Sequence, residues 1–208
     1  QVEISESKDD LRDYFKISKK SFIIGAVGAF ESRKGHDHLI KAVAILNKKG
    51  CDIGAAICGA GDKTKWQELA RNEGVEDKLY FFSRLPEMDL IKLHRSVDAY
   101  CNLSNSPRSC GLDLALLEAM ASGLPIVVYD NGALPTSVEE GKNGYIVRTD
   151  DIEGVVKAFG YLYEKTEEDR KIMGRASIGI ASKCDINKTA QIKIGWFEEV
   201  IKKYKNKS

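Results

Sequence analysis

The sequence lacks the features that mark several large classes of protein. It has only 4 prolines and 18 glycines in 208 residues, which excludes a collagen-like or low-complexity chain. Its longest strongly apolar run, residues 124–129, is far shorter than the roughly 18 residues that a membrane-spanning helix needs. The 32 Lys and Arg residues balance 31 Asp and Glu residues, so the chain lacks the basic excess typical of proteins that bind nucleic acid. What remains is a globular domain with an ordinary core, and we expect no nucleic-acid partner.

The cysteines do not form a pattern that is typical of disulfides or of a metal site. They are odd in number and include no Cys-x-x-Cys pair: Cys51, Cys58, Cys101, Cys110 and Cys184. We therefore expect reduced thiols and a cytoplasmic protein. No signal peptide is recognisable, and the chain begins with Gln1 rather than Met, so we expect a fragment or a processed product.

Short apolar segments alternate with amphipathic stretches along most of the chain. The apolar segments, which we predict to be strands, are residues 22–28, 53–58, 79–82, 99–103, 125–129 and 144–147. Between them apolar residues recur at helical spacing, and helical sequence continues from about residue 152 to 205 with breaks near Gly174 and Asp185. This alternation predicts an α/β fold, a Rossmann-like, doubly wound parallel sheet of six strands. We expect residues 1–208 to form one domain, in which residues 150–208 are C-terminal helices.

Right-handed crossovers make 3-2-1-4-5-6 the expected order of the six strands. In that order the chain reverses direction between the first and fourth strands. Ligands of such sheets bind outside the carboxyl ends of the strands at this switch point. The candidate site is therefore the loop 28–35 facing the loop 104–111.

The first of these loops carries two cations, Arg33 and Lys34, just before a helix that His36 opens. Free backbone N–H groups and the helix dipole favour an anion there, so the loop suits a diphosphate. The alternative is that both charges are merely solvated. His36 and His38 fall on different faces of the helix, which favours capping and surface roles over a metal site.

Glu118 is the one charged residue in the otherwise apolar segment 114–121. Burying a carboxylate is costly unless it is hydrogen-bonded. A ligand that presents hydroxyl groups, such as a ribose, would satisfy it, and so would an Arg or Lys partner within the fold.

Several motifs in order resemble one known family. Residues 117–127, with Leu117, Glu118, Gly123 and Pro125 in their places, resemble the signature of the group-1 family of retaining glycosyltransferases. Further matches are Gly28 with the Lys34-Gly35 pair and the segments 57–61, 79–85, 131–135 and 140–145. These are enzymes of two Rossmann-like domains, the GT-B fold, and the chain is similar to their C-terminal, donor-binding half.

The resemblance implies a role for each matched residue. Lys34 neutralises the donor diphosphate, with Arg33 as a helper, and Glu118 accepts hydrogen bonds from the ribose. The other expected donor-binding positions are Gly28, the main chain around Arg84 and Leu85 for the base, and the region of Cys110, Gly111 and Leu112 for the diphosphate and sugar. Members of the family need no metal for catalysis, because cations and helix N-termini stabilise the leaving group. We expect no metal and no cofactor beyond the donor substrate.

The sequence also departs from the family pattern. Cys110 stands eight residues before Glu118, where the family has a glutamate that contacts the sugar, and Ala29 replaces an arginine. Asp113 takes the place of a small residue, where it would repel a diphosphate unless it points away. We interpret Cys110 as a small residue that lines the sugar pocket rather than as a nucleophile, because no base accompanies it.

By this resemblance the protein moves a sugar from a nucleoside diphosphate sugar to an acceptor hydroxyl with retention of configuration. An N-terminal domain, to which residues 1–20 would lead back, would bind a saccharide or lipid-linked acceptor and supply any general base. The present chain alone would then bind nucleotide without transferring sugar. The alternatives are a non-catalytic binding module of the same fold and a sugar-nucleotide epimerase. The Lys-rich end is either a solvated helix terminus or a peripheral contact with anionic lipid.

Overall fold

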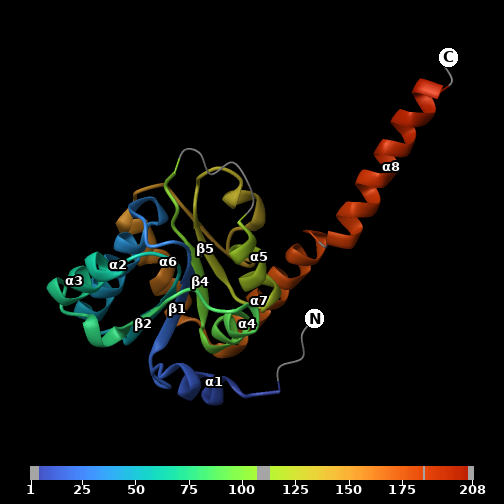
Figure 1. Ribbon diagram of the computed structural model, residues 1–208. Helices are drawn as coiled ribbons and strands as arrows, with labels where there is room; N and C mark the ends of the chain where they lie inside the picture. Colours follow the sequence, from blue (N-terminus) through green and yellow to red (C-terminus); the bar gives the residue numbers. More distant parts are fainter. Residues whose placement is uncertain (1–4, 107–112, 185, 206–208) are drawn as a thin grey trace.

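A single parallel sheet organises the chain, as the computed structural model shows for residues 5–106, 113–184 and 186–205 (Figure 1). Its six strands follow the order β3-β2-β1-β4-β5-β6, and all pairs are parallel. The predicted fold class and strand order are therefore confirmed. In the described part of the chain, no helix has both the length and the apolar character to cross a bilayer.

The strands match the predicted segments to within a residue at each end. They are β1 (Phe22–Val27), β2 (Ile53–Cys58), β3 (Leu79–Phe82), β4 (Ala99–Asn102), β5 (Ile126–Tyr129) and β6 (Gly144–Val147). The four central strands β1, β2, β4 and β5 are buried almost throughout, because helices cover both faces of the sheet, whereas the edge strands β3 and β6 are only partly buried.

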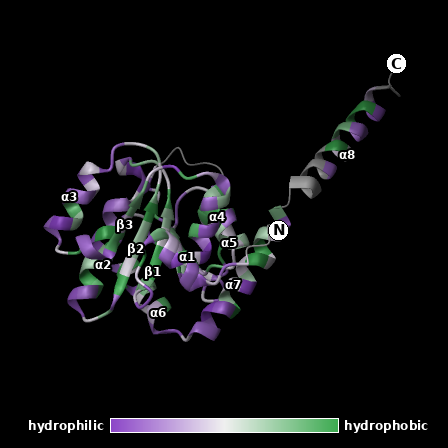
Figure 2. Cartoon of the chain, turned by 60° about the horizontal axis from the view of Figure 1, so that its bottom comes forward, coloured by the Kyte–Doolittle hydropathy of each residue, from purple (hydrophilic) through white to green (hydrophobic). Residues whose placement is uncertain are grey.

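Helices cover both faces. On one face lie α2 (His36–Lys48), α3 (Thr64–Asn72) and α6 (Ile152–Glu164), and on the other α1 (Lys8–Phe15), α4 (Glu87–Ser96) and α5 (Leu114–Ala121). Neighbouring side chains of β1 point to opposite faces of the sheet: Ile24 packs under α2, and Ile23 packs under α4 and α5. Figure 2 shows largely hydrophobic strands between helices in which hydrophilic and hydrophobic residues alternate.

The predicted helix break near Gly174 is wrong. The chain breaks at Thr166, whose side chain begins α7 (Glu167–Ala181) with a capping box that involves Asp169. Helix α7 then runs through Gly174 without interruption. Glycine is needed there for packing, because a Cβ at this position would overlap the carbonyl oxygen of Gly123, which follows α5.

The last helix, α8 (Ile186–Lys205), extends away from the rest of the chain (Figure 1). It is amphipathic, and six large apolar side chains in its described part are exposed: Ile194, Trp196, Phe197, Val200, Ile201 and Tyr204. The four cysteines that the structure describes form no disulfide, in line with the expected reduced thiols; Cys110 lies outside the described residues.

Candidate functional site

The two loops that were predicted to face each other do so over the described residues. Strands β1 and β4 are neighbours in the middle of the sheet, with Gly25 opposite Tyr100. Beyond their carboxyl ends, the carbonyl oxygen of Arg33 accepts hydrogen bonds from the Asn105 amide at 3.0 Å and the Ser104 hydroxyl at 3.2 Å. The crevice at the switch point is thus bounded by loops that are hydrogen-bonded to each other.

Gly35 lets the first loop lie directly on the end of β4. Its φ is +69°, and a Cβ would overlap the carbonyl oxygen of Leu103. The next residue, His36, is buried, with Nε2 at 3.2 Å from the carbonyl oxygens of Gly28 and Ala29. Burial lowers the pKa of His36, so the neutral ring donates to the loop carbonyls.

The expected surface roles of the two histidines are therefore wrong. His36 fixes the first loop from inside, and His38 is mostly buried, with Nδ1 at 2.8 Å from the Tyr129 hydroxyl. Their side chains point to different partners, as expected from their spacing. Among the described residues, no group of three or more His, Cys, Asp or Glu side chains is arranged to hold a metal ion.

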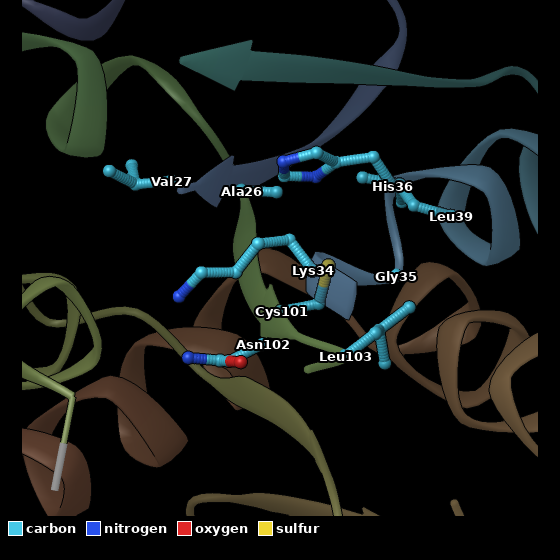
Figure 3. Close-up of a pocket in the computed structure, with 9 residues that line it drawn as sticks. All are labelled: Ala26, Val27, Lys34, Gly35, His36, Leu39, Cys101, Asn102 and Leu103. Atoms are coloured by element: carbon cyan, nitrogen blue, oxygen red, sulfur yellow. The ribbon is translucent and has the colours of Figure 1, made fainter. Parts of the chain in front are cut away.

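Lys34 lies at the centre of the crevice. Its aliphatic chain crosses Gly28, where a Cβ would come within 3.2 Å of Cδ. Its Nζ lies 3.8 Å from Oδ2 of Asp113. Figure 3 shows Lys34 extended beside Asn102, between the ends of β1 and β4. Both residues line a cavity of about 10 Å³, which has room for a single water.

We expect Asp113 to repel a diphosphate unless it points away. In the structure its carboxylate accepts hydrogen bonds from two groups of the protein. Oδ1 caps α5 by accepting from the Ala115 amide at 2.9 Å, and Oδ2 accepts from Nδ2 of Asn102 at 3.0 Å. With Lys34 close by, its charge is balanced within the protein.

A larger cavity of about 470 Å³ opens beside this crevice, a size that suits small-molecule ligands. The ends of β1, β2 and β3 and the side of α5 form its walls. The predicted site residues Gly28, Arg84, Leu85 and Glu118 all line it. Gly59 lets the chain after β2 approach the chain after β1 closely on this wall, since a Cβ there would overlap the carbonyl oxygen of Gly28.

Glu118 is not buried, contrary to the expectation from its apolar helix. The side chain is exposed along the wall of the larger cavity, so its carboxylate is only partly desolvated. Partial desolvation, followed by repulsion from Glu87 and Asp113, raises the pKa of Glu118. In the part of the chain that the structure describes, no Arg or Lys forms an ion pair with it, so the internal-partner alternative is not observed.

The remaining predicted residues divide into two groups. Arg33 forms an ion pair with Glu31 on the exposed side of its loop, and its main chain rather than its side chain faces the crevice. Cys110, Gly111 and Leu112 lie outside the described residues.

Sequence reasoning missed Glu87, whose side chain lines the larger cavity. It is the first residue of α4, directly after the Pro86 that precedes this helix. A proline between the end of a strand and a helical stretch indicates such a position, and the carboxyl ends of parallel strands indicate the site. The two signals together indicate the region in which Glu87 lies, but not that its side chain lines the cavity with Glu118.

The fold is that of a Rossmann-like α/β domain, and the candidate site lies at its switch point. Over residues 7–178 the chain matches the family of glycosyl transferases group 1, and it belongs to that family.

Relatives support the same family. The chain is 32% identical over 154 residues to an uncharacterised glycosyltransferase of Haemophilus influenzae, covering 73% of the chain and 42% of that protein. It is 28% identical over 163 residues to a GDP-mannose-dependent phosphatidylinositol monomannoside mannosyltransferase of Mycolicibacterium smegmatis, covering 76% and 42%. The chain thus spans less than half of these relatives.

Among solved structures, Anabaena HepE in complex with UDP superimposes with a TM-score of 0.83 at 20% identity. The match covers 95% of this chain and 54% of HepE. At this level of identity the likeness concerns the fold, which is that of glycosyltransferases.

Proposed function

We propose that this chain is the donor-binding domain of a glycosyltransferase that transfers a sugar from a nucleoside diphosphate sugar to an acceptor hydroxyl. The observation that carries the proposal is the position of Lys34 at the centre of the switch-point crevice, with the Glu118 carboxylate on the wall of the adjoining cavity. A cation and a hydrogen-bond acceptor in neighbouring compartments suit a diphosphate linked to a ribose.

The donor would place its diphosphate in the crevice at Lys34 and its ribose in the adjoining larger cavity. Lys34 and the N-terminus of α2 would stabilise the diphosphate, both in the bound donor and as the leaving group. The Glu118 carboxylate would accept hydrogen bonds from the ribose hydroxyls, since no described Lys or Arg side chain forms an ion pair with it. Arg33 would contribute at longer range, because its side chain pairs with Glu31.

The proposal extends to the whole enzyme. We infer retention of configuration from the family, and a further N-terminal domain that binds a saccharide or lipid-linked acceptor and supplies any general base. The curated relatives are more than twice as long as the segment that matches, which leaves room for such a domain. The chain itself would bind donor without transferring sugar, and no metal or other cofactor would take part.

The C-terminal helix supports a proposed peripheral contact with an anionic membrane. The α8 helix exposes Trp196 and Phe197 on its apolar side and carries the exposed pair Lys202 and Lys203. Co-sedimentation with vesicles rich in anionic lipid tests this contact. A Trp196→Ser variant should sediment less, whereas equal recovery with neutral vesicles would count against it.

Calorimetric titration of this chain with UDP, GDP and ADP tests nucleotide binding. At least one should bind below millimolar concentration, and the Glu118→Gln variant should bind it more weakly. If none binds, the proposed function fails.

Assay of the full-length protein then separates the alternatives. Sugar transfer that requires an acceptor supports the transferase. Nucleotide binding without turnover would favour a non-catalytic module, and conversion of the donor without acceptor would favour an epimerase.

A further inference from the structure

The larger cavity holds more charge than a ribose requires. Its lining includes three charged side chains, Arg84, Glu87 and Glu118, and the rest of the lining is uncharged. The proposed function, on which this inference rests, assigns Glu118 to the ribose and the main chain of Arg84 to the base. It leaves the side chains of Arg84 and Glu87 without a role.

Arg84 and Glu87 flank the point where β3 passes into α4. Pro86 lies between them in an extended conformation and precedes the first turn of the helix. Both side chains are exposed, and within the described ranges neither forms a hydrogen bond or ion pair. A hydrogen-bond donor group and a hydrogen-bond acceptor group, three residues apart in the sequence, are therefore both available on the wall of this cavity.

The two carboxylates in this cavity also repel each other, since Glu87 contributes to the raised pKa of Glu118. A ligand that donates hydrogen bonds to both acids relieves that repulsion. The ribose hydroxyls serve Glu118 in the proposed function, which leaves Glu87 as an acceptor for donor groups of the nucleobase.

Uracil, adenine and guanine differ in the hydrogen-bonding groups that they present to an arginine and a glutamate. Uracil presents one N–H between two carbonyl acceptors, and adenine presents an amino group beside a ring acceptor. Guanine presents two adjacent donor groups, N1–H and the 2-amino group, along with the O6 and N7 acceptors that an arginine contacts with two hydrogen bonds. A carboxylate beside an arginine complements guanine best.

We propose that Glu87 accepts hydrogen bonds from N1–H and the 2-amino group of guanine while Arg84 donates to O6 and N7. The donor of this enzyme is accordingly a guanosine diphosphate sugar. Arg84 and Glu87 are specificity-determining residues and take no part in the transfer step.

Titration calorimetry with GDP, IDP, UDP and ADP on this chain tests the inference. IDP is the informative probe, because hypoxanthine keeps N1–H, O6 and N7 and lacks only the 2-amino group. We expect GDP to bind about tenfold tighter than UDP or ADP and about fivefold tighter than IDP, the range of one well-placed base contact.

Two variants test the contributions of Glu87 and Arg84 to guanine binding separately. Glu87→Gln should weaken GDP binding and bring the GDP-to-IDP affinity ratio close to one. Arg84→Gln should weaken GDP and IDP equally and keep the ratio, since both bases carry O6 and N7. Glu153→Gln is the matched control, because Glu153 is likewise an exposed acid in the first turn of a helix, α6, and should change nothing.

The outcomes separate this inference from the proposed function. If UDP or ADP binds as tightly as GDP, or if Glu87→Gln keeps the GDP-to-IDP ratio, the guanine assignment is wrong and donor binding stands. If none of the four nucleotides binds, the proposed function fails and the inference fails with it.

Discussion

The ammonium group of Lys34 lies 3.8 Å from the carboxylate of Asp113, the residue that caps α5. This contact joins the loop after β1 to the helix that carries Glu118. It holds the cation at the crevice before any ligand arrives, and an ordered cation loses less entropy on binding than a mobile one. The departure of Asp113 from the family pattern therefore has a structural purpose in this chain.

Replacing Lys34 with Met should weaken nucleoside diphosphate binding by about tenfold or more, because one charge-assisted contact to the diphosphate is lost. Binding of the corresponding nucleoside, which carries no phosphate, should change little. Calorimetry on both ligands measures the difference. Lys49→Met, at the exposed C-terminal end of α2, is the control, and equal losses for nucleoside and diphosphate would contradict the assigned role.

Replacing Glu118 with Gln should stabilise the empty protein near neutral pH while it weakens nucleotide binding. The pKa of Glu118 is raised, so its charged form is disfavoured in the folded state, and the gain from Gln should be present above this pKa and vanish as the pH falls through it. Thermal unfolding at pH 7 and pH 4 measures the gain. A lower Tm for the variant at pH 7 would show that the carboxylate is stabilising.

The same shift predicts the pH dependence of ligand binding. Only the carboxylate form of Glu118 accepts two ribose hydroxyl hydrogens, so nucleotide affinity should fall as the pH drops through its raised pKa. Titrations between pH 7.5 and about 4.5 follow this loss. The Glu118→Gln variant should bind weakly with a flatter profile, and an equally steep profile would assign the dependence to another group.

His94 should make the fold sensitive to acid. It is buried, packs edge-on against Tyr100 with 5.5 Å between ring centroids, and burial lowers its pKa to about 4. The unfolded chain binds a proton near the ordinary value of 6.5. Stability should therefore fall by about 3 kcal/mol between pH 6.5 and 4.

The His94→Phe variant keeps a ring at this position and removes the titration. Denaturant unfolding across the same pH range should show a smaller loss of stability for the variant. Parallel curves for the two proteins would mean that other groups cause the acid sensitivity.

A substitution of Gly35 tests whether the first loop lies directly against the end of β4. Gly35→Ala should destabilise the protein by more than the roughly 1–3 kcal/mol that a left-handed backbone costs, because its Cβ would also overlap the Leu103 carbonyl. Gly50→Ala separates the two effects, since Gly50 has a φ of +88° and nothing within 4 Å of the added atom. Denaturant unfolding compares them, and similar losses would argue against the close approach.

The sequence predicts the sheet well because its signals are local. A short apolar segment marks each strand, and the handedness of crossovers leaves few strand orders, so the order and the switch point follow. The break near Gly174 was misplaced because a glycine can serve packing as well as helix termination. The contact with Gly123, about fifty residues earlier, has no local signature.

The site was predicted in outline but not in its electrostatics. Gly28 and Lys34 lie at the predicted crevice, and Glu118 lies on the wall of the cavity beside it, because loop positions follow from topology. The exposure of Glu118 and the pairing of Asp113 with Lys34 depend on how loops and a helix meet in space. Glu87 was missed for the same reason, since its distance to Glu118 is a tertiary property.

A crystal structure of this chain soaked with a nucleoside diphosphate tests the central claim most directly. The account predicts the diphosphate against Lys34 and the N-terminus of α2, with the ribose hydroxyls hydrogen-bonded to the Glu118 carboxylate. A nucleotide bound elsewhere on the chain, or a crevice that stays empty at saturating nucleotide, would contradict it.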